Sequence, residues 1–474
     1  MADKETQVVV IGGGPGGYAA AFMAADAGMQ VTLVDPGENP GGVCLYRGCI
    51  PSKALLHAAK VIFDSREAEM IGLSFSGLKI DHNRLRKWKD DVVAKLTGGL
   101  GQLAKQKKIA YIRGEAFFED NRTLRITTDD GQKSSLSFAH AVIATGSHPV
   151  RLPGTDIESE HLLDSTSALD LKTIPKTLLV VGGGYIGLEL GTVYAALGTK
   201  VEVVEMTEDL LPGGDKDLVR VLKRRISETF EAIHLQTTVK GMQEEKNGIQ
   251  VTLQGPEGEP RKQLFEKVLV AVGRRPNAGN IGLENTKVKT NQRGFIEVDE
   301  QRRTAEKHIF AIGDVAGEPM LAHKATHEGR TAAEVIAGRN VMFQPAAIPA
   351  VVFTDPEIAW AGLSEAEAKE IGIAFKVTRF PWGASARAAT LGRNEGLTKL
   401  IIDTDTERLL GIGIVGPGAG EMIAEGVLAL EMGANATDIG LTIHPHPTLT
   451  ETIMEAADIF HGSATHYHAP KRKK

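Results

Sequence analysis

The stretch QVVVIGGGPGG, residues 7–17, decides the fold. Its apolar run VVVI is typical of a buried strand, and Gly12, Gly14 and Gly17 follow in GxGxxG spacing. An alanine-rich helix and a second strand come next, and that strand ends in Asp35. In this context the glycines let the backbone approach a diphosphate at the helix N-terminus, while the acid accepts hydrogen bonds from a ribose. We therefore predict a dinucleotide-binding unit rather than a glycine-rich turn without a ligand.

The same unit recurs later in the chain. An apolar strand precedes Gly182, Gly184 and Gly187, and a second strand ends in Glu205, at the spacing that separates Asp35 from its own glycines. A duplicated unit predicts two bound dinucleotides. Because a carboxylate at this position bonds the ribose hydroxyls and repels a 2′-phosphate, Glu205 favours NAD over NADP as the second ligand.

Three more apolar strands end in short turns that close these units or return to the first sheet. The turns are Thr145–Gly146, Gly273 and Gly313–Asp314. The carboxylate of Asp314 could hold the sugar-alcohol chain of a flavin, and a simple strand-end turn is the alternative. Residues 274–277 are expected to form a linker.

The chain has two cysteines, Cys44 and Cys49, and both lie in GGVCLYRGCIPSK, residues 41–53. They could be two buried apolar thiols or belong to a metal site, although zinc needs about four ligands and no nearby histidine completes such a set. A redox pair is the favoured interpretation. On an ideal helix their Cα atoms would lie about 8.6 Å apart, beyond the roughly 7 Å that a disulfide tolerates. We therefore predict a distorted or just-starting helix near Gly48 and Pro51, and a helix start would also lower the pKa of a thiol.

Composition and charge bound the function classes. A chain of 474 residues should hold roughly three or four domains, and 42% hydrophobic and 24% charged residues are typical of globular proteins. The net charge of −6 argues against nucleic acid as the main partner. Two cysteines cannot form the disulfide framework of a secreted protein, which favours the cytoplasm. Residues 6–25 are uncharged, but their glycines and Pro15 fit a strand–turn–helix better than a membrane span.

The character of the sequence changes after Phe343. Alternating strand patterns run from residue 353 to 416, and a helix is expected over 420–432. Near the end, HPHPTLTE places Glu451 five residues after His446. This pair could form an oriented general base, and a surface histidine near a helix start is the alternative.

Together these motifs resemble the pyridine nucleotide–disulfide oxidoreductase family, over essentially the whole chain. GGGPGGYAA, GGVCLYRGCIPSKAL, ATG, GGGYIGLE, VGRRPN, IFAIGD, FTDPEIA and HPHPTLTE occur in the family order. The resemblance implies an α/β fold with two Rossmann-like dinucleotide-binding domains, for FAD and NAD, and a C-terminal α+β dimerisation domain. The expected boundaries are 1–150 for the FAD domain with the redox disulfide, 151–276 for the NAD domain, 277–345 for a central segment completing the FAD domain, and 346–474 for the interface domain.

The resemblance also implies roles for individual residues. Cofactor binding would fall to Gly12, Gly14, Gly17, Asp35, Lys53, Thr145, Gly146, Gly313 and Asp314 in the FAD part, and to Gly182, Gly184, Gly187, Glu189, Glu205 and Gly273 in the NAD part. Lys53, which by itself could equally be a solvated lysine, would pair with Glu189 beside the flavin ring. No metal site is expected.

The implied catalytic residues are Cys44, Cys49, His446 and Glu451. Cys44 would be the interchange thiol and Cys49 the thiol next to the flavin. His446, oriented by Glu451, would be the base and would come from the other subunit of a homodimer. His444 lies outside the matched position and is expected to be structural.

The implied activity is the oxidation of protein-bound dihydrolipoamide by NAD, in a 2-oxo acid dehydrogenase complex whose lipoyl domains and acyltransferase core would be partners. One alternative is an NAD(P)H-dependent reductase of another small disulfide such as glutathione, which would usually show CVPKK where this chain has CIPSK. Another is a non-catalytic flavoprotein scaffold or redox sensor. The chain departs from the family at Val43, where Thr is usual, and at Tyr46 and Arg47, where Asn and Val are usual.

Overall fold

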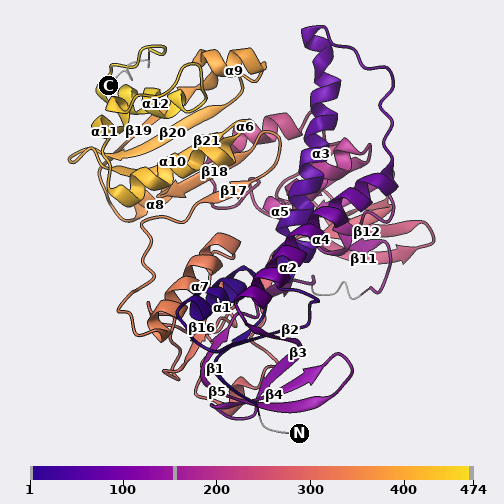
Figure 1. The fold of residues 1–474 in the computed structure, drawn as a ribbon. Helices are drawn as coiled ribbons and strands as arrows, with labels where there is room; N and C mark the ends of the chain where they lie inside the picture. The colour runs from indigo at the N-terminus through magenta and orange to yellow at the C-terminus, as the bar shows by residue number, and fades with distance from the viewer. Residues whose placement is uncertain (1–3, 153–156, 469–474) are drawn as a thin grey trace.

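The computed structural model describes residues 4–152 and 157–468, which form three units (Figure 1). The first unit lies at the bottom of Figure 1, the second at the right, and the C-terminal unit at the upper left. Each unit is built around its own sheet with flanking helices, so the α/β class expected from the sequence is confirmed.

The first unit contains a six-stranded sheet in the order β1-β2-β3-β4-β5-β16, with β1 also paired to β5. Its strands are β1 (Lys4–Ile11), β2 (Val31–Asp35), β3 (Ala110–Phe118), β4 (Thr123–Thr128), β5 (Lys133–Ile143) and β16 (Ile309–Ala311). Strand β1 runs parallel to β2 and β5, and its apolar run is buried because both faces of a parallel sheet are covered. Strand β16 joins this sheet only after the chain has completed the second unit.

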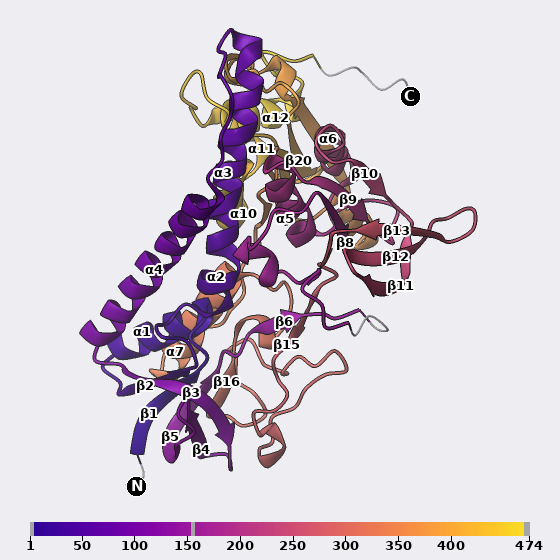
Figure 2. The ribbon, with the colours of Figure 1, turned by 90° about the vertical axis from the view of Figure 1, so that its right-hand side faces the viewer.

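Two helices, α1 (Pro15–Asp26) and α7 (Ala322–Ile336), lie side by side against this sheet (Figures 1 and 2). A Cβ added to Gly329 would lie 2.4 Å from the carbonyl oxygen of Gly16, so glycine is required for this close approach. The helix α1 begins at Pro15, inside the first glycine motif, so Gly17 lies in its first turn.

The second unit repeats the plan with a five-stranded sheet in the order β10-β9-β8-β14-β7, in which every pair is parallel. Its elements are β7 (Leu162–Leu163), β8 (Thr177–Val181), α5 (Tyr185–Ala196), β9 (Lys200–Val204), α6 (Lys216–Ile226), β10 (Ala232–His234) and β14 (Lys267–Val270), with an antiparallel sheet of β11 (Thr238–Glu245), β12 (Gly248–Gln254) and β13 (Arg261–Phe265). The linker expected at 274–277 does connect the units, but most of it is a strand. It forms β15 (Arg274–Pro276), which pairs with β6 (Ser147–Pro149) because the two chain crossings between the units run side by side.

The third unit is an antiparallel sheet in the order β17-β18-β21-β20-β19. Its elements are β17 (Ala350–Val352), β18 (Ile358–Gly362), α8 (Glu365–Glu370), β19 (Phe375–Pro381), α9 (Ala386–Leu391), β20 (Leu397–Asp403), β21 (Leu409–Val415), α10 (Ala419–Met432), α11 (Ala436–Leu441) and α12 (Glu451–His461). Residues of β20 and β21 share one apolar core with residues of α10 and α12.

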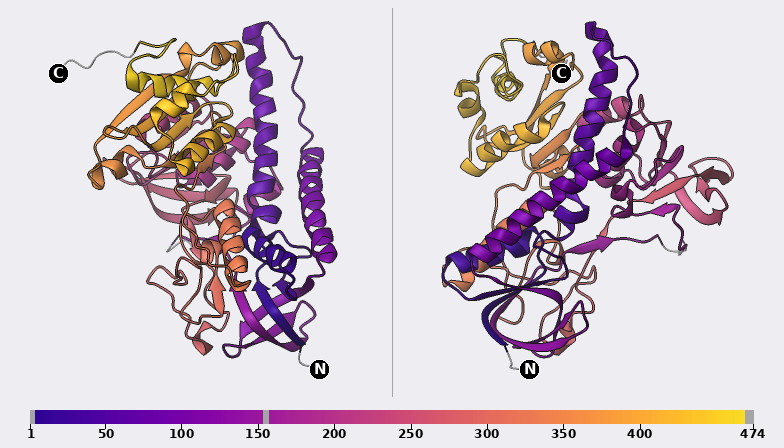
Figure 3. Two further views of the ribbon diagram at one scale, coloured as in Figure 1. Left: turned by 60° about the vertical axis from the view of Figure 1, so that its left-hand side comes forward. Right: turned by 45° about the vertical axis from the view of Figure 1, so that its right-hand side comes forward.

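A helical arm completes the fold. It consists of α2 (Gly42–Arg47), α3 (Cys49–Glu67) and α4 (His82–Gln106), and it projects away from the first sheet to the level of the C-terminal unit (Figures 2 and 3). Leu55 and Leu56 of α3 share a core with Leu188 and Leu190 of α5, so the arm joins the first unit to the second. In the described parts of the chain, none of the helices combines the length and apolarity needed to cross a bilayer.

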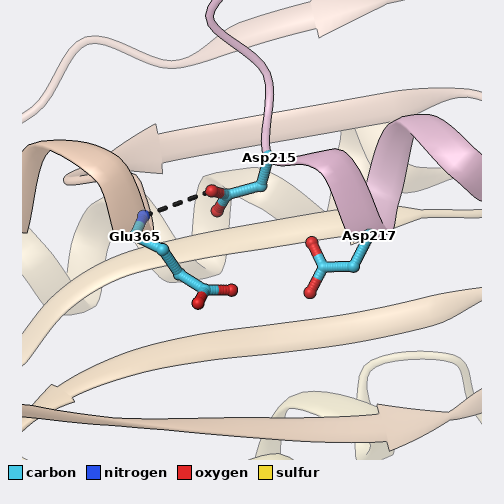
Figure 4. Close-up of side chains that lie close together, drawn as sticks. All are labelled: Asp215, Asp217 and Glu365. Atoms are coloured by element: carbon cyan, nitrogen blue, oxygen red, sulfur yellow. Dashed lines mark hydrogen bonds between the residues drawn. The ribbon is translucent and has the colours of Figure 1, made fainter. Parts of the chain in front are cut away.

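A buried lysine joins the second unit to the third. Three carboxylates, those of Asp215, Asp217 and Glu365, lie close enough together to share a cation (Figure 4). The ammonium of Lys399 fills that role, because its Nζ lies 2.8, 3.0 and 2.5 Å from them respectively. Burial raises the pKa of Asp217, but Lys399 and Arg379 together outweigh burial and hold that pKa below its usual value.

Replacing Lys399 by methionine is expected to destabilise the protein by about 3 kcal/mol, because it leaves Asp215 without its counter-ion and leaves Asp217 and Glu365 with Arg379 alone. The melting temperature measures this effect. As a matched control, Lys87→Met removes an exposed i,i+4 pair with Asp91 and should change stability by less than about 0.5 kcal/mol. Equal melting temperatures of the two variants would contradict a stabilising role for Lys399.

Candidate active site

The two cysteines lie on either side of a helix break. Helix α2 ends before Gly48, whose φ of −146° and ψ of −114° are not helical, and α3 begins at Cys49. A Cβ on Gly48 would lie 2.9 Å from the carbonyl oxygen of Val43, so a glycine lets the start of α3 lie close to α2. This confirms the predicted helix start, and it places Cys49 at the positive end of a 19-residue helix.

The environment of the thiols gives them different acidities. Both are partly buried free thiols, and a hydrogen bond joins their side chains. This bond from Cys44 is the largest cause that lowers the pKa of Cys49 to about 7, and Lys53 adds to it against the opposing effect of burial. The same hydrogen bond, together with burial, raises the pKa of Cys44. When the pair is reduced, Cys49 is therefore the thiolate near neutral pH.

A partly buried ion pair lies next to the cysteines. Lys53 Nζ lies 2.8 Å from Glu189 Oε2, and the Glu189 side chain is only 4% exposed. The other oxygen of Glu189 accepts the N–H of Phe353 at 2.9 Å, and Lys53 lies 4.6 Å from the centroid of the Phe353 ring. The residues come from α3, α5 and the segment before β18, so packing of all three units places this charge pair.

A cavity of about 1260 Å³ adjoins both the cysteines and the first glycine motif. It exceeds the roughly 300–1,000 Å³ of ordinary small-molecule pockets, as an extended dinucleotide requires. The predicted residues that line it are Gly12, Gly14, Asp35, Cys44, Cys49, Lys53, Thr145, Gly146, Glu189, Gly313 and Asp314. Gly17, Gly182, Gly184, Gly187, Glu205, Gly273, His446 and Glu451 do not line it.

The first glycine motif fits a bound diphosphate. A Cβ on Gly12 would lie 2.3 Å from the carbonyl oxygen of Ala144, and one on Gly17 would lie 1.9 Å from that of Gly12. A Cβ on Gly14 would meet no atom within 4 Å, so the N-terminus of α1 has free space in front of it. Gly17 thus serves helix–strand packing, whereas Gly14 faces the space that a phosphate can fill.

The second motif repeats these contacts. A Cβ on Gly182 would lie 2.5 Å from the carbonyl oxygen of Ala271, while Gly184 again faces open space. Glu205 Oε2 accepts the N–H of Gly183 at 2.7 Å, as Asp35 Oδ2 accepts that of Gly13 at 2.6 Å. The residues present therefore fit a second dinucleotide.

Two residues that the sequence did not single out hold the turn at Asp314. Ser147 Oγ donates to Asp314 Oδ2 at 2.5 Å. Glu328, which is fully buried, accepts the N–H of Gly313 at 2.6 Å and pairs with Lys324 and Arg302. The i,i+4 spacing of Lys324 and Glu328 was the available sequence signal, although such pairs are common on exposed helices.

His446 and Glu451 are brought together, but away from the cysteines. His446 Nδ1 lies 2.9 Å from Glu451 Oε1, and the imidazole is 64% exposed. Burial raises the pKa of Glu451, but the Thr448 N–H and His446 outweigh burial and hold it below its usual value. Helix α12, which begins at Glu451, lies far from α2 in two perpendicular views (Figures 1 and 2). His444 is instead nearly buried, with Nε2 2.7 Å from Glu425.

Comparisons with known proteins agree with this geometry. The family described as pyridine nucleotide-disulphide oxidoreductase matches residues 6–329, and its dimerisation domain matches residues 348–457. The chain is 48% identical over 470 residues to a dihydrolipoyl dehydrogenase of Haemophilus influenzae, covering 99% of this chain and 98% of that protein. It is 45% identical over 462 residues to a dihydrolipoyl dehydrogenase of Geobacillus stearothermophilus, covering 98% and 97%.

Solved structures show the same fold. The crystal structure of LpdA from Mycobacterium tuberculosis superposes with a TM-score of 0.89 at 27% identity, covering 96% of this chain and 99% of that one. The HOCl-induced flavoprotein disulfide reductase RclA from Escherichia coli, solved as a Cu(II) complex, superposes with a TM-score of 0.86 at 27% identity, covering 97% and 100%.

Proposed function

Since the chain belongs to the pyridine nucleotide–disulphide oxidoreductase family, we propose that it oxidises protein-bound dihydrolipoyl groups with NAD as the acceptor. It is an oxidoreductase that uses FAD and NAD, so the predicted family and cofactors are confirmed. The observation that carries the proposed reaction is the Cys44–Cys49 pair across the break between α2 and α3, beside Lys53–Glu189 on the wall of the large cavity.

In the proposed reaction, His446 of the partner subunit takes a proton from the substrate dithiol. The substrate thiolate attacks Sγ of Cys44 in the disulfide, which forms a mixed disulfide and releases Cys49 as a thiolate. The second substrate thiol then displaces Cys44 and gives its proton to the departing Cys44 sulfur, and the substrate leaves as a disulfide. When bound in the cavity that Cys49 lines, FAD would supply a two-electron acceptor for the reduced cysteine pair, and NAD would be the final oxidant. The charge of Lys53 lowers the pKa of Cys49, which favours Cys49 as the leaving thiolate in the first exchange.

We further propose a homodimer formed through the C-terminal unit, which matches the family's dimerisation domain. Within one chain, the proposed general base His446 and its partner Glu451 lie away from the cysteines, so a complete site needs a second copy. Large apolar side chains also stay exposed on this unit, namely Leu428, Met432, Leu441 and Ile443. The proposed partners are the lipoyl domains and acyltransferase core of a 2-oxo acid dehydrogenase complex, and a cytoplasmic location stays a prediction.

NAD should exceed NADP in catalytic efficiency with dihydrolipoamide by at least roughly tenfold, or about 1.4 kcal/mol. The reason is Glu205, whose carboxylate is fixed by hydrogen bonds from the N–H groups of Gly183 and Thr207 and repels the negative charge of a 2′-phosphate. Steady-state rates with each nucleotide measure this preference. Comparable efficiencies with NAD and NADP would show that Glu205 does not line the ribose site. In a separate assay, faster turnover of glutathione disulfide than of lipoamide would contradict the proposed substrate.

A further inference from the structure

Tyr46 stands where the family usually has Asn, and the structure gives it a specific partner. Its hydroxyl accepts the N–H of Asn39 at 3.0 Å and donates to the carbonyl oxygen of Asn39 at 3.1 Å. Its ring lies against two glycines of the same loop, because a Cβ on Gly41 would lie 3.1 Å, and one on Gly37 3.5 Å, from Cε2 of Tyr46. The Tyr46 side chain of α2 therefore contacts loop 36–41 at Asn39 and on either side of it, at Gly37 and Gly41.

Loop 36–41 connects the proposed ribose-binding residue Asp35 to the helix that carries Cys44. It begins after Asp35, at the end of β2, and leads to α2, which carries Cys44. Asp35 Oδ1 accepts the N–H of Gly37 at 2.7 Å, and the hydroxyl of Tyr111 donates to the Gly37 carbonyl oxygen at 2.9 Å. Asp35, Gly37 and Tyr46 all line the large cavity.

We propose that Tyr46 is a positioning residue for the adenosine end of FAD. It fixes loop 36–41 from the redox helix and so holds Asp35 ready for the ribose hydroxyls before the cofactor binds. This inference rests on the proposed FAD site. Without the hydroxyl, the N–H and C=O of Asn39 lose their partner, and FAD must order the loop when it binds, which weakens binding.

Dilution of the Tyr46→Phe holoenzyme tests the proposal, because released FAD can be followed by its fluorescence. We expect release about tenfold faster than in the wild type, equivalent to about 1.4 kcal/mol. Tyr194→Phe is the matched control. The Tyr194 hydroxyl donates to the carbonyl oxygen of Ala168 at 2.8 Å in the second unit, so its loss should lower the melting temperature without speeding FAD release.

The variant Asp35→Ala separates this inference from the site on which it rests. If the proposed FAD site is correct, Asp35→Ala releases FAD faster than the wild type. Fast release from Asp35→Ala together with wild-type release from Tyr46→Phe would overturn the role of Tyr46 alone. FAD release at the wild-type rate from both variants would overturn the FAD site as well. A lowered melting temperature of Tyr46→Phe with an unchanged rate of FAD release would show that Tyr46 has only a structural role.

Discussion

Replacing His446 by glutamine is expected to lower the rate of dihydrolipoamide oxidation by about 10²–10⁴-fold, the usual contribution of a positioned general base. Glutamine keeps a polar group of similar size but cannot take the proton from the substrate thiol. Glu451 Oε1, which lies 2.9 Å from Nδ1 of His446, would lose the imidazole that it orients. Steady-state turnover with dihydrolipoamide and NAD measures the loss.

Reduction of the same variant by NADH is the internal control. It should stay near the wild-type rate, because it requires no proton from a substrate dithiol. His444→Gln is a second control, since His444 is nearly buried against Glu425 and has no proposed part in the reaction. Equal losses with NADH and with dihydrolipoamide would show that His446→Gln damages the whole protein.

The two-chain origin of the site can be tested by mixing inactive variants. Cys44→Ser and His446→Gln homodimers, unfolded and refolded together, should form heterodimers with one intact site of two. Random pairing makes half of all dimers heterodimers, and each heterodimer has one intact site of two. Activity should therefore return to about a quarter of the wild-type value. No recovery despite demonstrated subunit exchange would place base and cysteines in the same chain.

Replacing Cys49 by serine should abolish dihydrolipoamide oxidation while FAD stays bound, because Cys44 then has no partner with which to form a disulfide. The variant should also lack the long-wavelength thiolate–flavin absorbance on two-electron reduction. Cys44→Ser is the matched control, since its Cys49 cannot form the disulfide and should give that absorbance with oxidised FAD, without any reduction. Because the pKa of Cys49 is about 7, the band in reduced wild-type enzyme should weaken as the pH falls below neutrality.

Local patterns made much of the fold predictable. The strand–turn–helix segments at Gly12 and Gly182 are each contained in a short stretch, and both appear in the structure as predicted. The break between α2 and α3 was predictable for the same reason, since Gly48 interrupts the helix between the cysteines.

Contacts between distant segments could not be predicted in this way. The N–H of Phe353 reaches Glu189 only because the third unit packs beside the second. Lys399 likewise meets Asp215 because α6, which Asp215 precedes, packs on the third sheet, although nothing in the sequence around Lys399 marks it as buried. Sequence spacing predicts neither contact, because each depends on how the folded units pack against one another.

Anaerobic titration of the wild-type holoenzyme with dihydrolipoamide tests the proposed electron path most directly. One equivalent should produce the thiolate–flavin absorbance, and one equivalent of NAD should then remove it and form one equivalent of NADH. This result would place the Cys44–Cys49 pair between the substrate dithiol and NAD. An unchanged spectrum after dihydrolipoamide, or NADH formation by Cys49→Ser at the wild-type rate, would contradict that path.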